Sequence, residues 1–148
     1  MSTDANKEVV RRFISEVWNA ENLHIADALI HPDYAIAGIG QGADAVRRNV
    51  AAYRTAFPDL TCVIEQLVAE GEWVAARLTL HGTHFGPLAG IAATGKRVRM
   101  QELVFWQVVE GKLRAIWSQG DSLGLRIQLG AIPASAWDQP VNQTEASS

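Results

Sequence analysis

Cysteine is nearly absent from this sequence of 148 residues, in which Cys62 is the only one. A single cysteine cannot form a disulfide within the chain, and no CxxC pair or cysteine–histidine cluster indicates structural zinc. Charge is also sparse, since only 20% of the residues are charged and the net charge is −3. This balance gives no basic surface for nucleic acid, so we predict no nucleic-acid partner.

Long apolar runs are missing as well. The first residues, Met1 to Asp4, contain no basic stretch that leads into an apolar one, as a secretory signal would. No run of about 18 apolar residues occurs, which argues against a membrane span. We therefore expect a cytoplasmic protein without a membrane partner.

The motifs for nucleotide cofactors and for acyl-transfer nucleophiles are absent. No GxGxxG follows a predicted strand and no GxxxxGK[ST] occurs, so nicotinamide, flavin and triphosphate lack their usual signal. There is no GxSxG, and no base is predicted beside Cys62. His81 and His84, three residues apart without a third ligand, are a weak metal pair. We predict no cofactor and no metal.

Apolar material, in contrast, is plentiful: 48% of the residues are hydrophobic and five are Trp. The length predicts one domain, residues 1–138, followed by a polar tail, 139–148, that we expect to be disordered. So much apolar material in a small domain suggests that it serves more than one buried surface.

The apolar periodicity changes along the chain. Spacing of three and four residues predicts three helices, at about 4–19, 23–30 and 43–57. After Pro58 the period becomes two, which predicts two hairpins, formed by 60–68 with 73–81 and by 97–109 with 112–121. A glycine-rich loop, at about 82–95, joins the two hairpins. A short apolar segment, 123–129, ends the predicted fold. Helices followed by antiparallel strands predict an α+β domain.

Both faces of the last predicted hairpin carry large apolar side chains. On its first strand Trp106 and Val104 lie on one face and Phe105 on the other; on its second strand Leu113 and Trp117 share a face. A sheet with one solvated face should alternate apolar with polar residues. We therefore predict a homodimer, a two-fold pair packed sheet to sheet.

Glu102 is the most informative polar residue, because it lies between Met100 and Val104 on a predicted strand. Burial would raise the pKa of its carboxyl and make it a general acid or base near neutral pH. The alternative is a structural ion pair with Arg97, Arg99 or Arg114.

Three further polar residues are candidates for the site. Asp121 follows the last strand, where it could reach a pocket mouth or cap the final helical segment. His84 lies in the glycine-rich loop and could exchange protons, and Ser118 is a weak donor on the last strand. The apolar and aromatic residues expected to line a substrate cavity are Val17, Tyr34, Tyr53, Leu80, Met100, Val104, Trp106 and Ile116.

Several short segments together suggest a family. They include the Val-Arg-Arg-Phe of the first helix, His31-Pro32-Asp33-Tyr34, Phe57-Pro58-Asp59-Leu60, Gly82-Thr83-His84-Phe85-Gly86 and Glu110-Gly111-Lys112. Over about residues 7–130 the chain resembles the SnoaL-like polyketide cyclases of the nuclear-transport-factor-two-like superfamily. The resemblance implies a cone-shaped, curved antiparallel sheet with the N-terminal helices packed on its concave face around a deep apolar cavity.

The resemblance also implies cofactor-free ring closure by aldol chemistry. In the family an aspartate removes a carbon-bound proton, and a histidine and an amide hold the developing enolate. In this sequence the amide position falls at Glu102, the histidine position at Val104 and the aspartate position at Ser118, while Asp121 matches a second acidic position. The two groups that carry the aldol mechanism are replaced.

We therefore expect a cofactor-independent cyclase that closes a ring in an apolar, polyketide-like intermediate. Two mechanisms remain open, an aldol-type closure that uses Glu102 or Asp121 and a cycloaddition promoted by orientation in the cavity. The alternatives are an epoxide hydrolase or isomerase, a cofactor-free oxygenase, or a non-catalytic protein that binds a small molecule.

Overall fold

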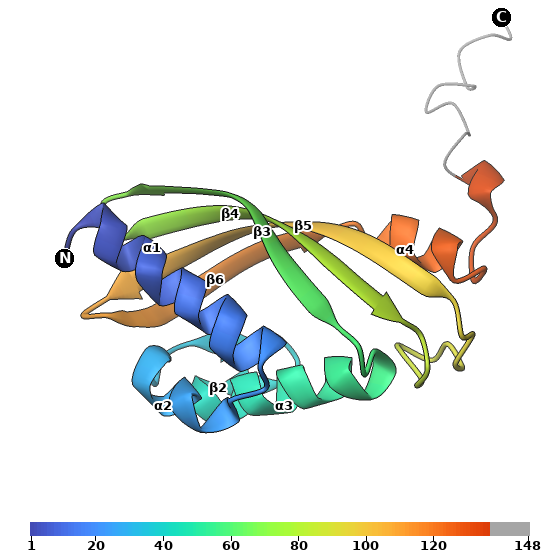
Figure 1. The fold of residues 1–148 in the computed structure, drawn as a ribbon, viewed down its shortest axis with the longest axis horizontal. Helices are drawn as coiled ribbons and strands as arrows, with labels where there is room; N and C mark the ends of the chain where they lie inside the picture. The colour runs from blue at the N-terminus through green and yellow to red at the C-terminus, as the bar shows by residue number, and fades with distance from the viewer. Residues whose placement is uncertain (137–148) are drawn as a thin grey trace, which may run out of the picture.

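The structure is a computed structural model, and it describes residues 1–136. Within this range a layer of helices packs under a four-stranded antiparallel sheet (Figure 1). The strands lie in chain order: β3 (Thr61–Glu70), β4 (Trp73–Thr83), β5 (Arg97–Val109) and β6 (Lys112–Gly120). The expected α+β class, with the helices on the concave face, is confirmed. The expected polar tail, 139–148, lies outside the described residues.

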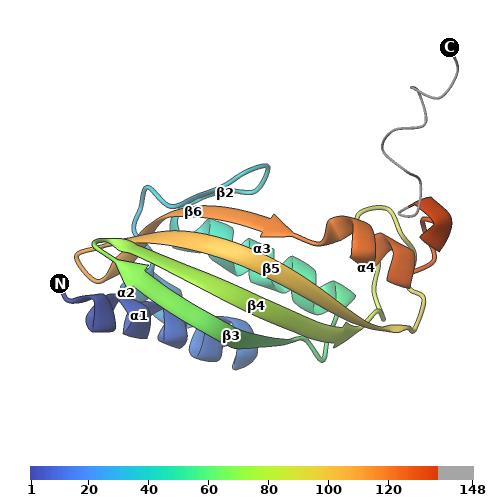
Figure 2. The same ribbon diagram turned by 90° about the horizontal axis from the view of Figure 1, so that it is seen from above.

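The helical layer is formed by the first third of the chain. The first helix, α1 (Thr3–Arg12), continues as a π-helical segment, Phe13–Asn19; a 3₁₀ turn, Leu23–Ile25, leads into α2 (Ala26–Leu29), and α3 is Gly42–Ala56. Figure 2, from above, shows α1 and α3 behind the sheet. Between α1, α3 and the sheet lies the core, where Val10, Val17 and Val74 have no exposed surface.

A small hairpin between α2 and α3 has no counterpart in the sequence prediction. Its strands are β1 (Ala35–Ile36) and β2 (Gly40–Gln41), paired antiparallel beside β6. Gly38 and Gly40 have φ values of +76° and +144°, which glycine adopts at little cost. Two residues per strand are too few to produce a period in the sequence.

Two bulges bend the sheet and shift the alternation. One lies between Ile64 and Gln66, and the other between Gln107 and Val108. An extra residue in one strand increases local twist and curvature. Strict alternation predicted Leu113 on the face of Trp117, but the second bulge re-registers β6, and Leu113 is fully buried. That prediction is therefore wrong for Leu113.

The last α-helix, α4 (Ser122–Gln128), packs beside the beginning of β5, as Figure 2 shows. It follows β6 directly, where an apolar segment was predicted at 123–129. No helix among residues 1–136 has the length and hydrophobicity needed to cross a membrane.

Candidate active site

A cavity of about 520 Å³ lies between the concave face of the sheet and the helical layer. This volume is within the range of about 300–1,000 Å³ typical of small-molecule sites. Most of its wall is apolar or aromatic, and its lining includes Phe13, Ile14, Trp18, Tyr34, Ile36, Ile39, Val46, Tyr53, Cys62, Leu78, Leu80, Val104, Trp106 and Ile116. The β1–β2 hairpin forms its rim beside β6.

Strands β5 and β6 place the polar groups in this wall. In the register, Val104 faces Ser118 and Trp106 faces Ile116, so these side chains point to the same side of the sheet. Glu102 lies two residues before Val104 on the same face, opposite Leu78 of β4. All of them line the cavity, as the alternation predicted.

Glu102 is the only carboxylate that lines this cavity among residues 1–136. Burial raises the pKa of its carboxyl, and a side-chain hydrogen bond with Ser118 partly offsets the shift. The ion pairs considered from the sequence do not form: Arg114 lies 3.4 Å from Asp33, and neither Arg97 nor Arg99 pairs with Glu102. The structure thus leaves Glu102 as a half-buried acid whose charge is not neutralised by a cation.

Tyr34 supplies a hydrogen-bond donor to the same cavity. Its hydroxyl oxygen accepts a bond from the indole Nε1 of Trp106 at 3.3 Å, so its hydrogen remains available for another acceptor. Burial, together with the negative charge of Glu102, raises the pKa of Tyr34. The same two causes raise the pKa of Tyr53. Both phenols are therefore protonated across the physiological range.

Several cavity residues were not singled out from the sequence, and Cys62 and Asn49 are the polar ones among them. Burial, with a contribution from Glu102, raises the pKa of the Cys62 thiol to about 12, so the thiol is protonated and forms part of the apolar wall. Asn49 contributes an amide from α3. It lies three residues after Val46 and four before Tyr53, so helical spacing could have identified it.

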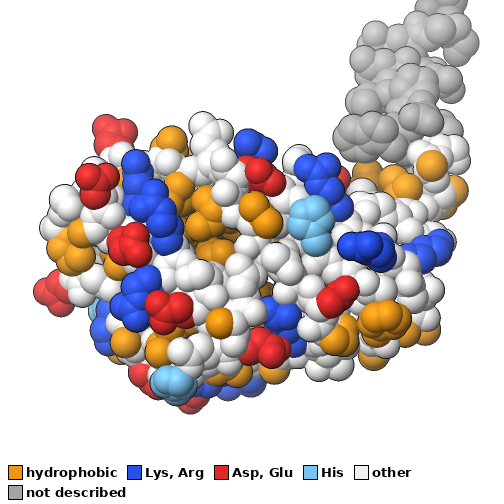
Figure 3. Space-filling view, viewed as in Figure 1, with side chains coloured by type: hydrophobic (Ala, Val, Ile, Leu, Met, Phe, Trp, Pro, Cys, Tyr) orange, Lys and Arg blue, Asp and Glu red, His pale blue; other side chains and the backbone are white. Residues whose placement is uncertain are grey.

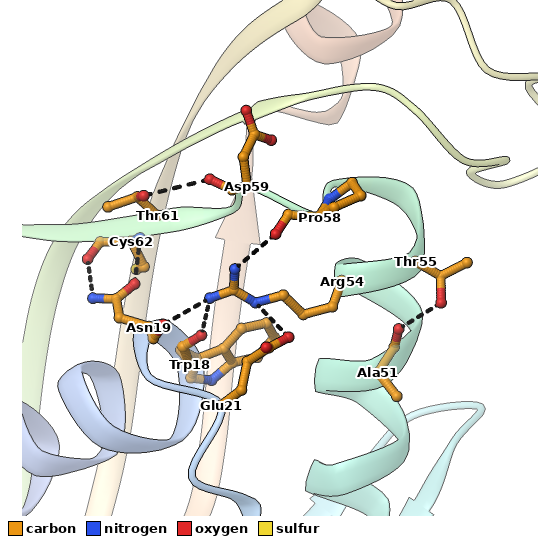
Figure 4. Close-up of polar contacts among 10 residues, drawn as sticks. All are labelled: Trp18, Asn19, Glu21, Ala51, Arg54, Thr55, Pro58, Asp59, Thr61 and Cys62. Carbon is orange, nitrogen blue, oxygen red and sulfur yellow. Dashed lines mark hydrogen bonds and ion pairs between the residues drawn. The ribbon is translucent and has the colours of Figure 1, made fainter.

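Arg54, near the end of α3, ties together the segments around one side of the cavity (Figure 4). Its guanidinium donates to the backbone oxygens of Trp18, Asn19 and Pro58 and pairs with Glu21 at 3.2 Å. Asn19 continues the network, since its side chain exchanges hydrogen bonds of 2.9 and 2.8 Å with the backbone of Cys62. This network fixes Trp18 and Cys62 relative to α3.

Asp121 and His84, expected at the site, do not line the cavity. The carboxylate of Asp121 caps α4 by accepting the N–H of Gly124 at 2.9 Å. His84 is fully buried, and its Nδ1 accepts the N–H of Thr94 at 3.2 Å. Its ring therefore links the two ends of the glycine-rich loop, and it does not face the cavity.

Two expected wall residues are also displaced. Val17 has no exposed surface and belongs to the core, and it is not among the residues that line the main cavity. Met100, two residues before Glu102 on β5, lines a neighbouring cavity. The remaining predicted wall residues, Tyr34, Tyr53, Leu80, Val104, Trp106 and Ile116, line the main cavity.

Known proteins are similar to this chain in sequence and in fold. The chain is 31% identical over 131 residues to the aklanonic acid methyl ester cyclase DnrD of Streptomyces peucetius, covering 83% of this chain and 89% of that protein. It is 34% identical over 110 residues to the nogalonic acid methyl ester cyclase of Streptomyces nogalater, covering 70% and 82%. The structure of TsrD from Streptomyces laurentii superimposes with a TM-score of 0.82 at 25% identity, covering 89% and 99%.

The sequence profile of SnoaL-like polyketide cyclases matches residues 8–129, which include every residue of the cavity wall. The antiparallel sheet and the helices on its concave face agree with this match. The chain belongs to the SnoaL-like polyketide cyclase family and is a cyclase.

Proposed function

We propose that this cyclase closes a carbon–carbon ring in an apolar polyketide intermediate, without a cofactor, and that Glu102 is its acid–base group. The observation that carries the proposal is the position of Glu102 in an apolar cavity with a raised pKa. A carboxylate with a raised pKa is a stronger base, which suits removal of a proton from carbon next to a carbonyl.

The reaction needs one group that moves a proton and one that holds charge. The Glu102 carboxylate takes the proton, and the electrons of the broken C–H bond move onto the carbonyl oxygen to give an enolate. The Tyr34 hydroxyl donates a hydrogen bond to that oxygen. The enolate carbon then attacks a second carbonyl carbon, and the alkoxide that forms takes the proton back from Glu102.

The substrate class follows from the wall of the cavity and from the relatives. Aromatic and aliphatic side chains supply most of the surface, so a flat, mostly apolar molecule fits it. By their names, the relatives are cyclases of aklanonic acid methyl ester and of nogalonic acid methyl ester. Aklanonic acid methyl ester is therefore the first compound to test with this chain.

The test is the turnover of this ester by Glu102→Gln. The amide keeps the shape of the side chain and cannot take the proton, so turnover should fall about 10²-fold or more. Glu70→Gln, on the exposed end of β3, is the matched control and should keep full activity. Equal turnover by Glu102→Gln and the wild type would contradict the acid–base role and favour catalysis by orientation alone.

Mass spectrometry of the product tests the reaction class. Ring closure conserves the mass of the substrate, whereas hydrolysis adds water and oxygenation adds oxygen. A gain of ¹⁸O from labelled water or labelled O₂ would contradict the proposed cyclisation.

We also propose that the chain forms a homodimer through the convex face of its sheet. An outer apolar patch there consists of Val68, Trp73, Leu103, Phe105 and Trp117, all exposed. Arg97 and Arg99 lie beyond one end of the patch, and Glu70 and Glu72 beyond the other. Figure 3 shows basic side chains near α4 and also elsewhere on this face of the molecule.

A second copy suits this pattern of charge. A two-fold axis between the faces and perpendicular to the strands would bring the basic end of each copy onto the acidic end of the other. Light scattering should give twice the chain mass of 16.1 kDa. Phe105→Glu should shift it to the single-chain mass, whereas Thr61→Glu, outside the patch, should not. A wild-type protein of single-chain mass at micromolar concentration would contradict the dimer.

The proposed location is the cytoplasm. A reducing compartment keeps a single thiol such as Cys62 from pairing with other chains. No nucleic acid or membrane is proposed as a partner.

A further inference from the structure

A second cavity, of about 380 Å³, adjoins the main one. Its walls come from the glycine-rich loop, at Leu88 and Ile91, from the beginning of β5, at Met100, and from α4, at Leu125 and Arg126. Tyr53, Glu102 and Ser118 line both cavities. The proposed acid–base group therefore stands at the boundary between two spaces, and a molecule that passes Glu102 can enter both.

The two cavities differ in charge. No Lys or Arg lines the main cavity, whereas Arg126 lines the second one. Arg126 makes no ion pair with any carboxylate among residues 1–136. Ser122 adds a hydroxyl to the same wall. A guanidinium without a partner in the wall of a cavity is suited to bind a carboxylate or carbonyl oxygen.

We infer that the second cavity is a subsite for the oxygen-bearing, carboxyl-derived end of the substrate, with Arg126 as its binding residue. This inference rests on the proposed function. The apolar rings would lie in the main cavity, and the carbon chain next to the carboxyl end would pass Glu102. In this binding mode, the C–H bonds next to a carbonyl, which are the most acidic C–H bonds of the substrate, lie beside Glu102. The ligand class is thus an elongated polyketide with an apolar ring end and a carboxyl or carboxyl ester end.

The test uses two probes of equal size, anthraquinone-2-carboxylate and its neutral carboxamide. Binding is followed by quenching of tryptophan fluorescence, because Trp18 and Trp106 line the main cavity. The wild type should prefer the carboxylate. Arg126→Gln should weaken binding of the carboxylate about tenfold and that of the carboxamide less than twofold, since one charge-assisted contact is lost. Arg126→Lys should restore part of the preference.

Arg114→Gln is the matched control, because Arg114 is an exposed cation of β6 that lines neither cavity and should leave both affinities unchanged. A second variant, Leu125→Trp, narrows the second cavity alone and should weaken binding of both probes. Binding of the smaller 1-naphthol should remain unchanged. Equal loss of both probes in Arg126→Gln, or a wild type without preference for the carboxylate, would overturn the inference. The test needs no turnover, so failure of Glu102→Gln to lose activity would refute the proposed function separately.

Discussion

The two faces of β5 have similar hydrophobicity and different surroundings. Trp106 and Val104, on the concave face, are each 2% exposed, whereas Leu103 and Phe105, on the convex face, are 57% and 53% exposed. The concave face is covered by helices of the same chain, and nothing within residues 1–136 covers the outer apolar patch. Hydrophobic residues on both faces therefore do not have one explanation: one face forms the core and cavity wall, and the other is available to a partner.

Polar groups on the two sides of the sheet also differ in their exposure to water. In the cavity below the concave face, burial changes the chemistry of Glu102, Tyr34 and Tyr53 by raising their pKa values. On the convex face, Glu70 and Arg99 remain exposed to water. A carboxylate thus becomes a useful base only where the fold removes most of its water, which concentrates the chemistry on one face.

The largest expected difference between the two faces is in the stability lost when an aromatic side chain of β5 is truncated. Trp106→Ala leaves a void under the sheet and frees the Tyr34 hydroxyl, so the free energy of unfolding should fall by roughly 3–5 kcal/mol. Phe105→Ala should lower the free energy of unfolding of a single chain much less, because the Phe105 ring is half-exposed. Urea denaturation at a protein concentration below dimer formation provides the measurement. Equal losses from the two variants would refute the distinction between the faces.

The next effect concerns the hydroxyl of Tyr34. Tyr34→Phe removes the donor proposed to hold the enolate oxygen, so kcat should fall roughly 10²-fold. KM should change less, since the ring that contacts the substrate is retained. Turnover of aklanonic acid methyl ester measures both constants. A variant with wild-type kcat would exclude this hydroxyl from the reaction.

A smaller effect, of opposite sign, is expected on the other face. Thr79 pairs with Val63 and Gln101 on the convex side, is fully buried, and has a hydroxyl without a hydrogen-bond partner among the described residues. Thr79→Val keeps the shape and removes this unpaired group, so the free energy of unfolding should rise by about 1 kcal/mol. Thermal denaturation would detect the gain, and a loss of stability would indicate a hydrogen bond that Thr79 makes in solution.

The smallest expected effect is a dependence of stability on pH. Burial raises the pKa of Glu102 above its ordinary value of 4.5, so the folded chain keeps a proton that the unfolded chain releases. The proton on Glu102 therefore stabilises the folded chain fully below pH 4.5, and this stabilisation is lost as the pH rises through the raised pKa. Urea denaturation across this range should show the decrease in the wild type and in Glu70→Gln. Glu102→Gln should lack it, and an identical pH profile for this variant would contradict the raised pKa.

The sequence alone predicted much of the fold and the middle of the site. Strand β5 begins and ends where alternation placed it, and the shared face of Glu102, Val104 and Trp106 follows from a period of two residues. The family and the general activity could also be predicted from the sequence, because the short motifs of the family are spread along the chain. These features depend on local chemistry, which neighbouring residues specify.

The residues predicted less well depend on contacts between distant segments. The bulge between β5 and β6 moved Leu113 into the core, and strict alternation could not anticipate an inserted residue. His84 carries a chemistry suited to catalysis, yet its contacts with Thr94 use it to close a loop. Asp121 could serve a pocket or a helix end, and the direction of α4 selected the cap.

The abundance of apolar residues was evident from composition, and the sequence placed them on two faces of one sheet. Only the tertiary structure decided which face became the cavity, because the helices of residues 3–56 can cover just one side of the sheet. It also decided that Glu102 lies between two cavities, since α3, α4 and the glycine-rich loop meet there from distant parts of the chain. Local periodicity determines the faces of a strand, and long-range packing determines what each face meets.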